Sequence, residues 1–195
     1  MERVPNLIKS AARLQEVLKA AGTDSIVIGG LAVSFWGDPR ATRDVDFKVL
    51  VQRDDADRLI GSLPPDYRLL SPEPKQTLTR LGFLFAEDEG GIRLDLLLAE
   101  TNFDVEAVRR GLRLIVGSAD VVTVCTPEDL IVYKMISTRV RDHDDVQGIV
   151  RRQGKKLDDD YIISWLREFE EALDDSTLVE SYRQMSGAPP DDTRP

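Results

Sequence analysis

Apolar and polar residues follow two different periods along the chain, and the period changes near residue 126. Before that point, short apolar runs and alternating patterns are interleaved with helical spacing, whereas later apolar residues recur every three or four positions. We therefore predict an α/β core over residues 1–126 and a helical subdomain over residues 127–185. The polar, proline-containing end, residues 186–195, is expected to be a disordered tail.

The first half of the chain is predicted to mix helices with strands. Residues 44–49 read Asp-Val-Asp-Phe-Lys-Val, an alternation that is typical of a half-exposed strand. The expected elements are a helix over 4–21, a strand over 25–28, a helix over 31–36 beginning at the preceding glycines, a strand over 44–51, a helix over 53–63, a loop over 66–76, a hairpin of strands 77–86 and 92–98, a helix over 103–109 and strands over 112–116 and 120–125.

The second half is predicted to be helical throughout. Thr126 can cap a helix, Pro127 suits its first position, and Asp129 follows the cap by three residues. Helices are expected over 127–138, 142–153, 158–173 and 176–185.

Composition indicates a soluble, cytoplasmic chain. Its 195 residues suit one compact domain or a core with an appendage, and 42% of them are hydrophobic. No apolar run approaches the roughly 18–20 residues that span a bilayer, and the first residues lack a signal-peptide pattern. The single cysteine, Cys125, excludes an internal disulfide.

The formal net charge of −9 argues against non-specific DNA binding through a basic surface. It leaves open a nucleotide or nucleic acid held through metal ions. One histidine, His143, excludes a multi-histidine zinc site and disfavours a Ser-His-Asp arrangement.

Three aspartates stand out as candidate metal ligands. Asp44 and Asp46 leave the same face of the predicted strand, about 7 Å apart along the chain, and would repel each other without a cation between them. Asp95 is the acidic residue inside the apolar run 92–98, where an unpaired carboxylate is costly. Such oxygen ligands suit Mg²⁺ or Mn²⁺.

Gly29 and Gly30 lie where a strand gives way to a helix, so the backbone there can approach a phosphate closely. Taken alone, the glycine pair also fits an ordinary turn, and Asp44-Val45-Asp46 also fits a solvated strand end. The order of strand, glycine pair, helix, Asp-x-Asp strand and later acidic strand is more specific. Together these parts suit two-metal phosphoryl chemistry.

This order resembles the nucleotidyltransferase fold of the DNA polymerase beta superfamily, and most closely its small bacterial AbiEii-toxin-like branch. The resemblance covers roughly residues 24–165. It is carried by Ile28-Gly29-Gly30-Leu31-Ala32, by Arg40-Ala41-Thr42-Arg43-Asp44-Val45-Asp46, by Thr126-Pro127-Glu128-Asp129-Leu130 through Lys134, and by Arg141-Asp142 with Asp145. It implies an α/β (α+β) fold with a mixed sheet flanked by helices and a C-terminal helical subdomain.

By this resemblance Asp44 and Asp46 would bind two Mg²⁺ or Mn²⁺ ions, and Asp95 would complete the metal site or act as the base. Gly29 and Gly30 would contact the phosphates of the nucleotide.

Lys134 would contact the triphosphate by the same resemblance. Its apolar neighbours independently indicate that it either extends to solvent or meets an anion.

The remaining candidates flank the predicted site in sequence. Arg40, Thr42 and Arg43 precede the metal strand and can touch phosphate or acceptor, although Thr42 and Arg43 can also simply order the loop. Arg141, Asp142 and Asp145 are expected to form ion pairs that position Lys134.

The expected activity is transfer of an NMP from an NTP, such as ATP, to an acceptor hydroxyl with release of pyrophosphate. A toxin-like enzyme of this kind would modify a tRNA or a protein and would have an antitoxin partner. One alternative is an antibiotic nucleotidyltransferase acting on an aminoglycoside or lincosamide. Two others are a non-catalytic nucleotide-binding partner protein and a purely structural interaction protein.

Overall fold

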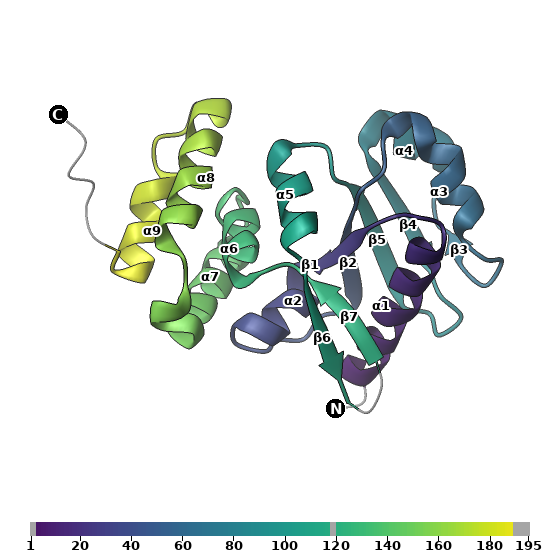
Figure 1. Ribbon diagram of the computed structural model, residues 1–195, viewed down its shortest axis with the longest axis horizontal. Coiled ribbons are helices and arrows are strands. Elements are labelled where there is room, and N and C mark those ends of the chain that lie inside the picture. The colour runs from purple at the N-terminus through teal and green to yellow at the C-terminus, as the bar shows by residue number, and fades with distance from the viewer. Residues whose placement is uncertain (1–2, 118–119, 189–195) are drawn as a thin grey trace. The chain divides into compact units, whose positions relative to one another are not determined.

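The computed structural model describes residues 3–117 and 120–188, without the side chains of residues 3–6. Most of the predicted tail therefore lies outside the described residues. The chain divides into two compact units, shown in Figure 1. One comprises Met1–Ala32 and Arg40–Thr126, and the other comprises Val33–Pro39 and Pro127–Pro195.

The first unit is the mixed α/β part of the chain. Its elements are α1 (Arg3–Ala20), β1 (Ser25–Ile28), the start of α2 (Gly29–Trp36), β2 (Asp44–Val49), a 3₁₀ turn (Arg53–Asp55), α3 (Ala56–Ser62), β3 (Arg68–Leu69), α4 (Pro74–Leu81), β4 (Phe83–Glu87), β5 (Arg93–Leu98), α5 (Asn102–Arg110), β6 (Leu112–Val116) and β7 (Asp120–Val124).

Seven strands form one sheet in the order β3-β4-β5-β2-β1-β7-β6. The central pairs β2–β5 and β1–β7 are parallel, whereas β1–β2 and the outer pairs are antiparallel, so the sheet is mixed as predicted. Because β1 and β2 run antiparallel at the centre, the end of β1 lies beside the start of β2. This topology brings the glycines after β1 close to the first aspartates of β2.

The two faces of β2 differ sharply in character. Val45, Phe47 and Val49 are fully buried, whereas Asp44 and Asp46 on the opposite face are partly exposed. Helix α1 packs against β7, β1 and β2, and α4 packs against β4, with α3 in contact with both helices. The apolar face of β2 therefore belongs to the core, and the acidic face remains accessible.

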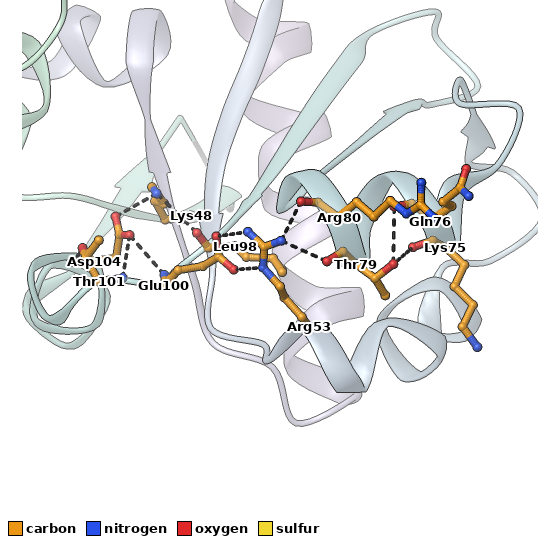
Figure 2. A network of polar contacts seen from close by, with 10 residues as sticks. All are labelled: Lys48, Arg53, Lys75, Gln76, Thr79, Arg80, Leu98, Glu100, Thr101 and Asp104. Atoms are coloured by element: carbon orange, nitrogen blue, oxygen red, sulfur yellow. Dashed lines mark hydrogen bonds and ion pairs between the residues drawn. The ribbon is translucent and has the colours of Figure 1, made fainter.

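A polar network fixes the far ends of β2 and β5 (Figure 2). The Lys48 ammonium lies 2.8 Å from the Asp104 carboxylate and donates to the Leu98 carbonyl. Asp104 also closes a capping box with Thr101 at the start of α5, and the nearby Arg53 pairs with Glu100. These contacts lie at the C-terminal ends of β2 and β5, whereas the aspartates lie near the N-terminal ends. The pairing of the two strands is therefore stabilised by residues outside the candidate site.

The prediction of a strand over residues 77–86 is wrong for its first part. Residues 77–81 belong to α4, which starts at Pro74 and ends at Leu81, and Gly82 caps it in a left-handed conformation with φ of 74°. Proline suits a first helical turn and glycine a helix end, and these signals outweigh the alternation of threonine and leucine. The loop predicted over 66–76 likewise contains β3 and the start of this helix.

The second unit is helical, as predicted for that half of the chain. Its main elements are α6 (Pro127–Met135), α7 (Val140–Gln153), a 3₁₀ turn (Gly154–Lys156), α8 (Asp159–Leu173) and α9 (Leu178–Ser186). Helix α6 packs on α7 and α8, and α9 packs on α7 and α8. Of the helices in the described ranges, none is long and apolar enough to cross a membrane.

Residues 33–39 join the helical unit through hydrogen bonds to the end of α7. The Arg152 guanidinium donates to the Gly37 carbonyl at 2.7 Å, and the Gln153 amide donates to the Trp36 carbonyl at 2.7 Å. Gly37 is also packed so tightly against Ile149 that a Cβ there would lie 2.9 Å from its side chain. The boundary between the two units therefore passes through α2.

Candidate functional site

The three candidate aspartates share one face of the sheet. Asp46 on β2 is the register partner of Asp95 on β5, and Asp44 precedes Asp46 by two residues on the same face. Adjacent strands lie about 4.8 Å apart, so the three carboxylates occupy neighbouring positions at the start of two parallel strands. We call this surface, with Asp44, Asp46 and Asp95, the carboxylate face.

Gly29 lies directly against the carboxylate of Asp46. Gly29 has a φ of 64°, which L-residues with side chains rarely adopt. A Cβ at this position would lie 2.7 Å from Cγ of Asp46 and would overlap its carboxylate oxygen. Glycine is therefore required here for two reasons, namely the backbone conformation and the approach of a predicted metal ligand.

Gly30 contacts the loop that leads into β2. A Cβ on Gly30 would lie 2.8 Å from Oγ1 of Thr42 and 3.4 Å from a guanidinium nitrogen of Arg40. The Thr42 hydroxyl in turn donates to Oδ1 of Asp44 at 2.9 Å. The structure thus brings together Gly30, Arg40, Thr42 and Asp44, whereas Arg43 is exposed.

Arg93 is a member of this group that the sequence interpretation missed. Its Nε donates to Oδ1 of Asp95 at 2.6 Å and its Nη2 donates to Oδ2 at 3.0 Å, a two-point contact. Its Cζ lies 4.3 Å from the ring centroid of Phe85. The spacing of two residues between Arg93 and Asp95 in a strand is the signal that would have found it.

The charge of Arg93 is stabilised by all three aspartates. The hydrogen bond to Asp95 raises the pKa of Arg93 above its ordinary value against the opposing effect of burial, and the negative charges of Asp95, Asp44 and Asp46 act in the same direction. Arg93 therefore supplies positive charge beside the carboxylate face.

The carboxylates match a hard divalent cation in donor type, because all three offer only oxygen. As the side chains stand in residues 3–117 and 120–188, no group of three or more His, Cys, Asp or Glu side chains is arranged to hold a metal ion. Asp44 accepts a hydrogen bond from Thr42, and Asp95 is engaged by Arg93. Asp44, Asp46 and Asp95 are the residues that would hold the predicted ions.

Lys134 belongs to the helical unit and is buried, with 7% of its surface exposed. Its ammonium lies 2.5 Å from Oδ1 of Asp142 and 2.9 Å from Oδ2 of Asp145, and Ser137 donates to the second oxygen of Asp142. Arg141 is exposed. Within the helical unit the lysine charge is thus used to join α6 to α7, and its contact with a triphosphate stays a prediction.

The helical unit is expected to lose stability in acid through Asp142. Burial raises the pKa of Asp142, but hydrogen bonds from Lys134 and Ser137 and the lysine charge outweigh it, so this pKa lies below its ordinary value. A carboxyl with a lowered folded pKa stabilises fully above its unfolded pKa, about 3.9, and loses that contribution as the pH falls through the folded value. Thermal unfolding of wild type and Asp142→Asn between pH 6 and pH 2.5 measures this contribution of Asp142 to stability.

The stability difference between these two proteins should shrink as the pH falls below about 4, because the titration is absent from Asp142→Asn. A difference that stays constant or grows towards low pH would contradict the assignment.

No family model and no curated protein matches the sequence. The chain is similar to the solution structure of the antibiotic-resistance factor ANT(2″)-Ia, with 15% identity over 85% of this chain and 96% of that one and a TM-score of 0.52. For ANT(2″)-Ia in complex with adenylyl-2″-tobramycin, identity is 12% over 91% and 97% of the two chains, with a TM-score of 0.52.

An antigenic nucleotidyltransferase-like protein from Paracoccidioides brasiliensis is 17% identical over 90% of this chain and 92% of its own, with a TM-score of 0.50. Similarity at such low identity concerns the fold alone. It confirms the fold class predicted from the sequence, a nucleotidyltransferase-like fold with a mixed sheet flanked by helices. The toxin-like branch and the individual site residues stay predictions.

Proposed function

We propose that this chain is a metal-dependent nucleotidyltransferase that moves an NMP from an NTP to an acceptor hydroxyl and releases pyrophosphate. The observation that carries the proposal is the register of β2 and β5, which sets Asp44, Asp46 and Asp95 on neighbouring positions of one face, with Gly29 against the carboxylate of Asp46. Three adjacent carboxylates supply oxygen ligands for a divalent ion, and the glycine backbone at the start of a helix is a place where a phosphate can bind.

The three aspartates of the carboxylate face and the two glycines have different roles in this proposal. Asp44 and Asp46 would hold Mg²⁺ or Mn²⁺, which when bound would neutralise charge on the phosphates. Asp95 would complete the ligand set or accept the proton of the acceptor hydroxyl. Gly29 leaves room for the carboxylate of Asp46 and Gly30 for the side chain of Thr42, and the backbone of both glycines would contact the phosphates. The fold shared with nucleotidyltransferase-like proteins supports this reading without identifying a substrate.

Two acceptor classes follow from different observations. The sequence motifs favour a toxin-like enzyme that modifies a tRNA or a protein and is paired with an antitoxin. The fold similarity to ANT(2″)-Ia, solved with adenylyl-2″-tobramycin, favours an aminoglycoside, and the net charge of −9 suits a cationic acceptor. We retain the toxin-like reading as the first candidate, because it rests on residues of this chain.

A labelling screen tests the proposal and separates the acceptors. The protein is incubated with Mg²⁺, each of the four α-labelled NTPs, and in turn total RNA, a protein extract and a panel of aminoglycosides and lincosamides. We expect one NTP to label one acceptor class. Nucleotide binding by calorimetry without any transfer would instead indicate a non-catalytic nucleotide-binding protein, and absence of both would leave an interaction protein.

A further inference from the structure

Arg93 is held in place from two sides. Its guanidinium makes the two-point contact with Asp95 and lies over the ring of Phe85. Phe85 is the register partner of Asp95 on β4, and its ring stacks on Phe83 with centroids 4.7 Å apart. An arginine fixed by both a carboxylate and an aromatic ring loses little further freedom in keeping this position.

Arg93 lies directly beside the candidate metal ligands on the carboxylate face. Arg93 is the register partner of Asp44 on β2, and it binds Asp95 two residues further along its own strand. The side chain of Asp95 is 13% exposed, whereas that of Arg93 is 46% exposed. A divalent ion that takes both oxygens of Asp95 must therefore replace a guanidinium that has access to solvent.

We propose that Arg93 is a positioning residue that acts through Asp95, holding its carboxylate in place and competing with divalent cations for it. The inference rests on the proposed function, since it concerns the same carboxylate face. Its consequence is that the free protein binds a bare divalent ion weakly. A nucleotide that brings its own ion would supply the additional contacts needed to displace the guanidinium.

A purely structural ion pair is the simpler alternative, and the two readings predict different results. If Arg93 only stabilises the sheet, removing it lowers thermal stability and leaves metal affinity unchanged. If it competes for Asp95, removing it raises metal affinity. The contact with Asp95 is made by a side chain that is nearly half exposed, so its loss should affect stability little.

The test is Mn²⁺ binding in the absence of nucleotide, followed by the electron paramagnetic resonance signal of free Mn²⁺. Arg93→Gln removes the charge, and we expect the dissociation constant for Mn²⁺ to fall about tenfold. Arg93→Lys keeps the charge without the two-point contact and should restore most of the weak binding. Phe85→Leu removes the ring beneath the guanidinium and should tighten Mn²⁺ binding by a smaller factor.

Arg58→Gln is the matched control. Arg58 is an exposed arginine of α3 in the same unit, paired with Asp55 at 3.3 Å, and its loss should leave the Mn²⁺ affinity unchanged. The inference is overturned if Arg93→Gln binds Mn²⁺ no more tightly than wild type, including the case in which neither binds it.

Asp46→Asn separates this inference from the proposed function. If Asp46→Asn weakens Mn²⁺ binding while Arg93→Gln does not tighten it, Asp46 is a ligand and only the role of Arg93 is wrong. If Mn²⁺ binds equally well to wild type and Asp46→Asn, the ion is held elsewhere, which contradicts the proposed function itself.

Discussion

Asp46→Asn is expected to reduce NMP transfer by at least about 10³-fold, because a metal ligand contributes several kcal/mol of charge stabilisation to phosphoryl transfer. Asn keeps the size of the side chain and removes its charge, so the packing against Gly29 is preserved. The rate of label transfer at saturating NTP, with the acceptor found in the screen, measures the loss. The same loss is expected for Asp44→Asn.

The control for this prediction is Asp24→Asn. Asp24 is an exposed aspartate of the same unit that precedes β1, so it lies at the opposite end of that strand from Gly29. Its substitution should leave the transfer rate within about twofold of wild type. If Asp46→Asn retains more than a tenth of the wild-type rate, Asp46 does not hold a catalytic metal ion.

Gly29→Ala is expected to impair both folding stability and transfer. The φ of 64° costs an alanine roughly 1–2 kcal/mol, and the new Cβ would also overlap the carboxylate of Asp46. Displacing a neighbour in a packed region adds about 1–3 kcal/mol. Thermal unfolding should therefore show a clear loss of stability, and transfer should fall because Asp46 is moved from its position.

Gly22→Ala is the control that measures how much unfolding free energy an alanine loses from a positive φ alone. Gly22 has a φ of 72°, close to that of Gly29, but a Cβ there would meet no atom within 4 Å. The loss of unfolding free energy in Gly29→Ala should exceed that in Gly22→Ala, and only Gly29→Ala should lower the transfer rate. Equal losses in both variants would show that the contact with Asp46 has no energetic consequence.

The parts of the fold predicted correctly are those in which local pattern and tertiary burial agree. The alternation of residues 44–49 identified a strand with one buried face, and the structure buries Val45, Phe47 and Val49. The glycine pair marked the start of a helix after a buried strand. In both cases the side-chain pattern directly reflects which face packs against the core.

The errors arose where local signals conflicted or where partners are distant in sequence. Residues 77–81 alternate like a strand, yet Pro74 and Gly82 delimit a helix. The assignment of residues 33–39 to the helical unit depends on hydrogen bonds to the end of α7, more than 100 positions later, as the separation of 115 between Arg152 and Gly37 shows. Sequence spacing carries no information on such a contact.

In the candidate site too, local features could be predicted from the sequence, whereas contacts between distant residues could not. The aspartates could be selected from the sequence because Asp95 interrupts an apolar strand and Asp44 and Asp46 follow the glycine pair in a specific order of elements, but their adjacency depends on the parallel pairing of β2 with β5. The engagement of Lys134 by two carboxylates inside the helical unit was expected as ion pairing, whereas the exposure of Arg141 could not be deduced from helical spacing alone.

The most direct test of the central claim, that the carboxylate face binds a nucleotide through divalent ions, is calorimetric titration with each of the four Mg²⁺-NTPs. It is carried out on wild type, Asp44→Asn and Asp46→Asn, with and without EDTA. We predict that at least one NTP binds wild type in a Mg²⁺-dependent manner and that each substitution weakens this binding at least about tenfold. Equal affinity in all three proteins, or affinity unaffected by EDTA, would contradict the account.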